Sequence, residues 1–264
     1  RKPRGTAEGD RSADQLLLSE PKLAEGKEYF RLGTLDVSPD GKLIAYSTDT
    51  DGSERYVLVV QDMASGKVLE TVAKDSLGQV VWQADSKALV WAQASAEWRP
   101  TKIWLHRLGA DKSELLYEEK EAGFWVQPEL TQDRRWILLN SYTQTTNEVR
   151  LLDAADPTKP AVLIRPRKTD VRYSVDSRGD TLFVLTNDDH VNFRIATASV
   201  SAPGEWTTLV AGSDDVYLTD ITAFASFLAV EERMRGLDQI RILWPDGRDQ
   251  RVKFPEDSYT ASLG

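Results

Sequence analysis

Few residues in this chain of 264 are of the types that usually do chemistry. There are two histidines, His106 and His190, and no cysteine. His106 alternates with Leu105 in a predicted strand and His190 ends a polar turn, so a structural role is favoured for both. Thiolate chemistry is excluded, and no group of ligands has the spacing of a metal site. We therefore expect neither a metal nor a cofactor.

The serine nucleophile of α/β-hydrolases also lacks a counterpart. Those enzymes place the serine in a Gly-x-Ser-x-Gly elbow between a strand and a helix. The nearest strings begin at Gly52 and Gly212, and both lack the second glycine and fall in predicted loops. The acidic pairs at 188–189 and 214–215 have the character of solvated turn formers. The residues thus predict no catalytic apparatus in this chain.

The elements show a clear internal repeat. Five turn-like clusters each run into an apolar, strand-forming stretch, and no long stretch has a helical period. Their spacings are 45 residues from Asp40 to Asp85, 48 to Asp133, 45 to Arg178 and 47 to Ala225. A fixed period in this range is typical of a β-propeller with one four-stranded blade per repeat. The predicted fold class is therefore all-β, a propeller of four-stranded antiparallel blades.

The repeat count predicts an incomplete ring. At about 46 residues per unit the chain holds five to six blade units. Residues 14–19 are predicted to be a further strand, residues 258–264 the innermost strand of a sixth unit, and residues 19–25 a turn of helix. Blades bury their faces against both neighbours, so a propeller must close. We expect one partial propeller domain over residues 1–264, belonging to a longer protein.

Charge and hydropathy exclude some partners. The formal net charge is −9, which disfavours nucleic-acid binding because that requires a basic surface. There is no run of 18 apolar residues, so no membrane span is predicted. The acidity has two interpretations: solubility, or steering of cationic peptides towards a tunnel lined by carboxylates.

Several strings resemble the propeller of one peptidase family. They run in order along nearly the whole chain, from about Leu16 to Gly264. In combination they are similar to the oligopeptidase B (protease II) branch of the prolyl oligopeptidase family of serine peptidases. The resembling strings are residues 23–30, 37–41, 49–56, 102–109, 117–119, 145–154, 185–187, 192–194, 231–233 and 236–237.

This resemblance implies a parent enzyme with two parts. One would be a seven-bladed propeller and the other a covalently linked α/β-hydrolase domain with a Ser-Asp-His triad. The family cleaves short peptides after Arg or Lys, and its propeller restricts entry to the active site. On this interpretation the hydrolase domain is absent from the chain, which should be inactive alone and act as the gate for short basic peptides.

Charged residues in or next to predicted loops are candidates for inter-domain contacts, and residues 231–237 are predicted to be one dense charged loop. The resemblance suggests that they latch the closed state, whereas the alternative is exposed loops with local ion pairs, each worth under about 1 kcal/mol. The candidates are Glu97, Arg99, Glu148, Arg150, Arg194, Glu231, Arg233 and Arg235.

Two other functions compete with the gating hypothesis. One is a stand-alone propeller that binds a protein partner, and a weaker one is an enzyme with its active site in the propeller channel. Downstream sequence discriminates the first two, because a Gly-x-Ser-x-Gly elbow encoded after Gly264 supports gating. The expected compartment is the cytoplasm, with the periplasm as the alternative.

Overall fold

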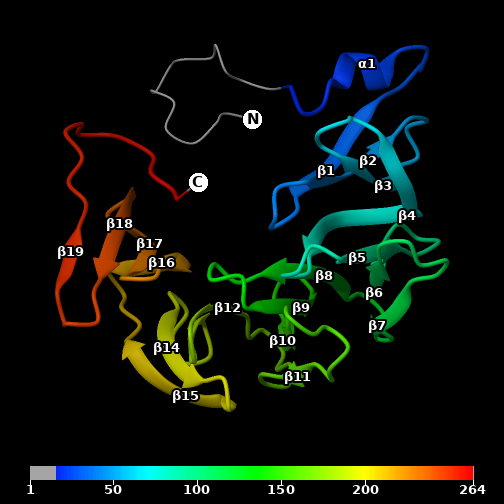
Figure 1. The fold of residues 1–264 in the computed structure, drawn as a ribbon. Helices are drawn as coiled ribbons and strands as arrows, with labels where there is room; N and C mark the ends of the chain where they lie inside the picture. Colours follow the sequence, from blue (N-terminus) through cyan, green and yellow to red (C-terminus); the bar gives the residue numbers. More distant parts are fainter. Residues whose placement is uncertain (1–15, 264) are drawn as a thin grey trace. The chain divides into compact units, whose positions relative to one another are not determined.

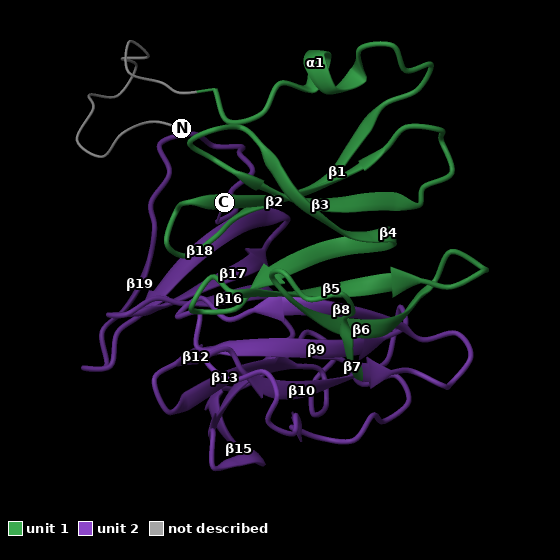
Figure 2. Cartoon of the chain, turned by 45° about the vertical axis from the view of Figure 1, so that its right-hand side comes forward, with its two compact units in different colours: residues 1–116 green, residues 117–264 purple. Residues whose placement is uncertain are grey.

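Antiparallel strands account for most of the computed structural model, which describes residues 16–263. This part contains nineteen strands and one short helix (Figure 1). The chain divides into two compact units, Arg1–Leu116 and Tyr117–Gly264 (Figure 2). No helix among the described residues is long and apolar enough to cross a membrane.

The first unit is built on one seven-stranded sheet, with strands in sequence order. A helix of five residues, α1 (Glu20–Ala24), precedes the sheet, and Ser19 caps its N-terminus. The strands are β1 (Arg31–Val37), β2 (Leu43–Asp49), β3 (Tyr56–Asp62), β4 (Val68–Trp82), β5 (Ala88–Ala94), β6 (Pro100–Arg107) and β7 (Glu114–Glu118).

The long strand β4 joins two repeats. Its first half pairs with β3, with Gln61 opposite Val68, and its second half pairs with β5, with Leu89 opposite Trp82. The register shifts along both pairings, which lets the strand bend away from one partner and towards the other. β4 therefore serves as the fourth strand of one blade and the first strand of the next.

The second unit contains three four-stranded sheets, each with its strands in sequence order. They form the third, fourth and fifth repeats. The third comprises β8 (Trp125–Leu130), β9 (Trp136–Tyr142), β10 (Asn147–Asp153) and β11 (Val162–Leu163). The fourth comprises β12 (Tyr173–Arg178), β13 (Thr181–Thr186), β14 (Arg194–Ser199) and β15 (Ala202–Val210). The fifth comprises β16 (Val216–Ala223), β17 (Leu228–Met234), β18 (Leu237–Leu243) and β19 (Asp249–Arg251).

The repeated turn clusters connect the first and second strands of each blade. In the first, the Asp40 carboxylate accepts hydrogen bonds from Ser38 Oγ at 2.7 Å and the Lys42 backbone at 3.1 Å. A residue with positive φ follows, which is Gly41 at 69° here and Arg134 at 58° in the third repeat. Short polar side chains that bond nearby backbone groups favour such turns. This local chemistry explains why the clusters could be recognised.

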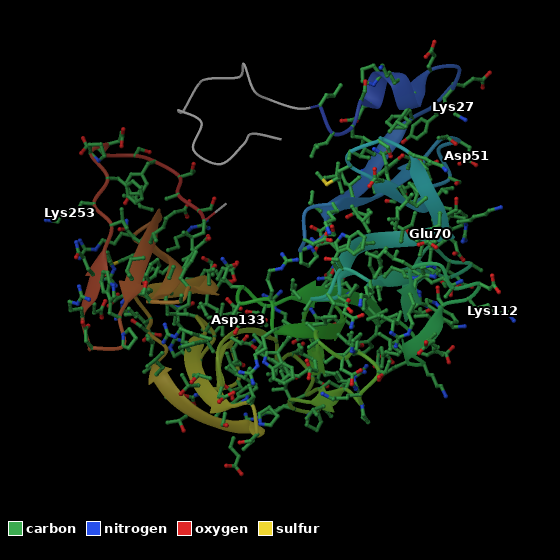
Figure 3. All side chains as sticks on the ribbon, in the orientation of Figure 1. Lys27, Asp51, Glu70, Lys112, Asp133 and Lys253 are labelled. Carbon is green, nitrogen blue, oxygen red and sulfur yellow. The ribbon has the colours of Figure 1, made fainter. Side chains whose placement is uncertain are left out.

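The period also appears in hydrogen bonds between neighbouring sheets of a unit. The Asp176 carboxylate accepts from the backbone N–H of Gln132 at 2.8 Å, 44 residues away, and of Ala223 at 2.6 Å, 47 residues away. Asp133, labelled in Figure 3, accepts from Ser177 Oγ at 2.7 Å, 44 residues away. Equivalent positions of successive blades therefore contact each other, as expected for a repeat protein in which each unit packs on its neighbours.

The hydrophobic core lies between successive repeats. One buried cluster joins the first two repeats around Trp82 and Leu89, and a second joins the third and fourth around Leu151 and Leu182. A third cluster joins the fourth and fifth repeats around Ile195 and Val230. The five clear repeats predicted from the sequence thus form five four-stranded blade units, with β4 shared between two of them.

The structure corrects three details of the fold predicted from the sequence. Residues 16–19 form no strand but lead into α1, while residues 14 and 15 lie outside the described part. Ser19 explains this, because its side chain accepts from the Lys22 backbone as a helix cap. Residues 258–263 form no strand either, because no neighbouring strand pairs with them in the described structure, and Gly264 lies outside it.

The third correction concerns residues 231–237, which the sequence indicated as a charged loop. Residues up to Met234 belong to β17 and Leu237 begins β18, so the connection is the two-residue turn at Arg235 and Gly236. Arg235 has a φ of 52° and Gly236 a φ of 83°, the paired positive values of a tight hairpin. The short helix predicted near 19–25 is confirmed by α1.

Candidate functional site at one end of the blades

Six of the eight charged candidates lie towards the same end of their own sheets. We call the end at which a blade's second strand passes to its third the B–C end. Glu97 and Arg99 lie in the connection between β5 and β6, and Arg235 in the one between β17 and β18. Glu148, Arg194 and Arg233 lie in β10, β14 and β17 towards their B–C ends, whereas Arg150 and Glu231 lie at the middle of β10 and β17. The topology therefore groups six of the eight candidates by end of blade, although they come from four distant parts of the sequence.

In the first unit, Glu97 and Arg99 belong to a well-bonded loop. Glu97 is exposed, and its carboxylate accepts from Ser95 Oγ at 2.9 Å. This bond lowers the pKa of Glu97. Between the two candidates Trp98 is 48% exposed and donates from Nε1 to the Ser53 carbonyl at 2.5 Å. The loop is held to the neighbouring blade through this tryptophan.

In the second unit, Glu148 and Arg150 form an ion pair in a larger network. Arg150 Nη1 lies 2.7 Å from Glu148 Oε1, and Arg167 Nη2 lies 3.0 Å from the same oxygen. Arg167 Nη2 also lies 2.6 Å from Glu119 Oε2, and Phe124 packs under the Arg167 guanidinium at 3.9 Å. Arg167 thereby ties the segment before the fourth blade to the third blade.

The network controls the protonation of its acids. Burial raises the pKa of Glu119, but hydrogen bonds from Ser141, the Glu121 backbone and Arg167 outweigh it and lower the pKa to about 2. For Glu148 burial is likewise outweighed, mainly by Arg167 and Arg150, and its pKa is lowered. Both carboxylates are therefore charged at neutral pH despite their burial.

Arg194 makes a bidentate pair within its own blade. Its Nε and Nη2 donate to the two oxygens of Asp188 at 2.8 and 2.9 Å, and its Nη1 donates to Thr208 Oγ1 at 2.8 Å. The bonds to Asp188 raise the pKa of Arg194. This buried arginine is fully engaged inside the fourth blade.

The three candidates of the fifth blade differ in their exposure and in their bonding partners. Glu231 accepts from the Leu263 backbone at 2.7 Å, which fixes the end of the described chain to β17. Arg233 is exposed and lies 3.0 Å from Asp238, and Arg235 is exposed at the turn. Among the described residues, Glu148 and Arg150 are the only two of the eight candidates that form an ion pair with each other.

Sequence reasoning missed a cavity at the B–C end of the second unit. Its volume is about 350 Å³, and it is lined by residues of the third, fourth and fifth blades. A second hollow of about 610 Å³, lined by Trp125, adjoins it and shares Tyr142 and Thr143. The lining residues of the first cavity are Asn140, Tyr142, Thr143, Asn147, Arg172, Tyr173, Ser174, Leu185, Phe193, Tyr217, Leu218, Thr219 and Asp220. The available signal was the recurrence of aromatic residues next to the B–C connections.

The histidines occupy structural places. His106 is buried in β6, with Nε2 3.3 Å from Glu70 and Nδ1 3.2 Å from Ser113. Glu70 is labelled in Figure 3. His190 accepts from the Asn192 backbone at Nδ1, 3.1 Å away, which shapes its own turn. Among residues 16–263, no group of three or more His, Cys, Asp or Glu side chains is arranged to hold a metal ion.

The comparison with protein families decides the assignment. The prolyl oligopeptidase N-terminal β-propeller domain matches residues 1–263. The chain belongs to the prolyl oligopeptidase family. Within this family it is 32% identical over 263 residues to dipeptidyl aminopeptidase BI of Pseudoxanthomonas mexicana, covering 97% of this chain and 36% of that protein. It is 26% identical over 256 residues to protease 2 of Moraxella lacunata, covering 96% of this chain and 37% of the relative.

Solved structures of the family agree with the fold. Oligopeptidase B from Trypanosoma brucei, in a closed form with covalently bound antipain, has a TM-score of 0.88 and 30% identity. It covers 98% of this chain, which matches 38% of that protein. Oligopeptidase B from Leishmania major has a TM-score of 0.89 at 26% identity, with 97% and 38% covered. The all-β propeller and its likeness to oligopeptidase B are thereby confirmed, and the chain spans little more than a third of these relatives.

Proposed function

We propose that the chain is the non-catalytic, gating propeller of a serine oligopeptidase. It would admit short peptides to a linked α/β-hydrolase domain whose Ser-Asp-His triad cleaves after Arg or Lys. The observation that carries the proposal is the grouping of charged side chains and open cavities at the B–C ends of the blades, in a chain of this family. The relatives extend well beyond the matched part, which leaves room for a catalytic domain.

The B–C ends are the proposed contact surface for the hydrolase domain. A latch needs charges that can leave their local partners, and the exposed Glu97, Arg233 and Arg235 meet this condition. Glu148 and Arg194 are buried and paired inside their blades, so their part would be to shape the surface. Exposed pairs contribute little each, so the closed state would depend on several together.

The catalytic part of the proposal is tested by comparing two proteins. The isolated 264-residue chain should neither hydrolyse an Arg-ended chromogenic peptide nor react with a serine-directed inhibitor, whereas the complete gene product should do both. Labelling of the isolated chain would overturn the proposal, because the serine would then lie in the propeller. An inactive complete product would favour a protein-binding module instead.

The latch is tested in the complete gene product with Arg233→Glu and Arg235→Glu together. The matched control is Arg248→Glu, because Arg248 is exposed at the opposite end of the same sheet, in the turn between β18 and β19. The double variant should cleave long peptides faster relative to short ones, since a weakened closed state admits larger substrates. A ratio equal to that of the control would refute a latch at these residues.

A further inference from the structure

The cavity of the second unit contains a cation without a carboxylate partner. Arg172 lies just before Tyr173, where β12 starts, and its backbone N–H donates to Asn187 Oδ1 at 2.7 Å. Its Nη1 donates to the Gln144 carbonyl at 3.2 Å, and no carboxylate of the described residues pairs with it. Arg165, Arg167 and Arg194, in contrast, each lie 3.3 Å or less from a carboxylate oxygen. The Arg172 guanidinium is therefore available to bind the carboxylate of a ligand.

Aromatic rings stand beside this cation. The Arg172 guanidinium lies 5.7 Å from the centre of the Phe193 ring, and Phe193 meets Tyr217 edge to face at 5.9 Å. Tyr142 lines the same cavity. Such rings pack on the aliphatic stem of a long side chain and attract a cation at its tip. The wall thus suits an Arg or Lys side chain.

A free acid completes the cavity. Asp220 Oδ1 accepts from the Ile221 backbone at 2.8 Å, and no described basic side chain pairs with the carboxylate. Asp220 is exposed and also lines a smaller cavity of about 220 Å³, together with Ser174. The cavity therefore offers an unpaired cation, apolar rings and an unpaired anion. A volume of about 350 Å³ lies in the usual range for small ligands.

We propose that this cavity binds short peptides that end in Arg or Lys with a free carboxylate. Arg172 would bind the terminal carboxylate, Asp220 the basic side chain, and Phe193 and Tyr217 the stem between them. Cleavage after a basic residue leaves one fragment with both of these groups on its last residue. The inference thus rests on the proposed function and makes the cavity a product-binding site of the propeller.

Calorimetry on the 264-residue chain tests binding without any hydrolase activity. The probes are acetyl-Phe-Gly-Arg as the free acid, the same peptide as the C-terminal amide, and the free acid with citrulline in place of arginine. The free acid should bind about tenfold or more tightly than either analogue, because a charge-assisted hydrogen bond is lost in each. Equal affinity for acid and amide, or no binding of the free acid at millimolar concentration, would overturn the proposal.

Four variants assign the two groups. Arg172→Gln should lose the preference for acid over amide, and Asp220→Asn the preference for arginine over citrulline. The matched controls are Arg248→Gln and Asp246→Asn, an exposed pair 2.9 Å apart in the turn between β18 and β19. Thermal unfolding shows whether each variant is folded. If Arg172→Gln binds like Arg248→Gln, the site is refuted.

The two hypotheses fail separately. An inactive complete gene product would refute the peptidase function but leave the measured selectivity of the cavity intact. Loss of that selectivity in an active gene product would refute the product site alone.

Discussion

Replacing Arg167 by methionine should destabilise the second unit strongly. Its guanidinium contacts Glu119 at 2.6 Å and Glu148 at 3.0 Å, and its backbone N–H donates to Glu148 Oε2 at 3.2 Å. The side chains of Glu119 and Glu148 are only 5% and 8% exposed. Methionine preserves the packing on Phe124 but leaves both acids without this cation. Arg150 still pairs with Glu148, so Glu119 is the more affected.

The expected loss follows from the pKa of Glu119. A pKa lowered from 4.5 to about 2 corresponds to at most about 3.4 kcal/mol at neutral pH, at 1.36 kcal/mol per unit. Ser141 and the Glu121 backbone supply part of this stabilisation of Glu119 and remain in the variant. The loss of the Arg167 contact at Glu148 adds to the destabilisation. Removing one partner of a buried ion pair typically costs about 3–5 kcal/mol. We therefore expect Arg167→Met to lower the free energy of unfolding by about 3 kcal/mol.

The effect should depend on pH with a definite sign. Because the folded-state pKa of Glu119 is lowered, its stabilising contribution is full above its ordinary value of 4.5 and is lost as pH falls towards 2. At pH 3 the contribution of Glu119 to the free energy of unfolding should be about 1.4 kcal/mol, compared with about 3.4 kcal/mol at neutral pH. The difference between wild type and variant should therefore narrow in acid.

Urea unfolding at pH 7 and pH 3 measures both numbers. The corresponding fall in melting temperature at pH 7 is about 6–12 °C for a chain of this size. Arg135→Met is the matched control, because the Arg135 side chain is 46% exposed and its partner Asp180 is 79% exposed. The control should lose under about 1 kcal/mol. The reasoning fails if Arg167→Met costs no more than the control, or if its effect grows in acid.

Three further substitutions test the packing of the blades by the free energy of unfolding in urea. Gly33→Ala should lower the free energy of unfolding by about 1–3 kcal/mol, because the new Cβ would lie 2.5 Å from the ring of Tyr56. A loss of less than about 0.5 kcal/mol, which is typical of a surface substitution, would contradict this. Asp176→Asn should cost about 1–3 kcal/mol, because an NH₂ group must then face a backbone N–H such as that of Ala223. Burial raises the pKa of Asp176, so its stabilising contribution is full below 3.8 and falls as pH rises; the variant should lack this dependence, and an unchanged pH profile would refute the assignment. Asp133→Ala removes bonds both within its turn and to the next blade, and should cost about 2 kcal/mol or more, whereas a loss like that of an exposed turn residue would contradict the role in joining blades.

The period could be recognised in the sequence because its cause is local. Asp40 and Asp133 bond backbone and hydroxyl groups within their own turns, and such residues leave a pattern that spacing reveals. Their second role, bonding the next blade, follows from the same period. The charged residues of β17 suggested an exposed loop, but Glu232 is buried against Arg251, and this contact between residues 19 positions apart leaves no local pattern.

Only part of the candidate site could be predicted from the sequence. Glu148 and Arg150 could be singled out because they adjoin a predicted loop. Arg167, which pairs with Glu148, lies 19 residues away from it in sequence, and Glu119, which pairs with Arg167, lies 29 residues away from Glu148. The cavity around Arg172 depends on side chains from three blades, and its shape follows from how the sheets pack. The cytoplasmic location stays a prediction.

The dependence of cleavage on substrate length tests the gating account most directly. The complete gene product would be given one Arg-containing cleavage sequence in peptides of increasing length and in a folded protein loop, and kcat/KM would be measured for each. A gating propeller predicts efficient cleavage of the short peptides and a steep fall as the substrate outgrows the entrance. Equal kcat/KM for the short peptides and the folded protein would contradict it.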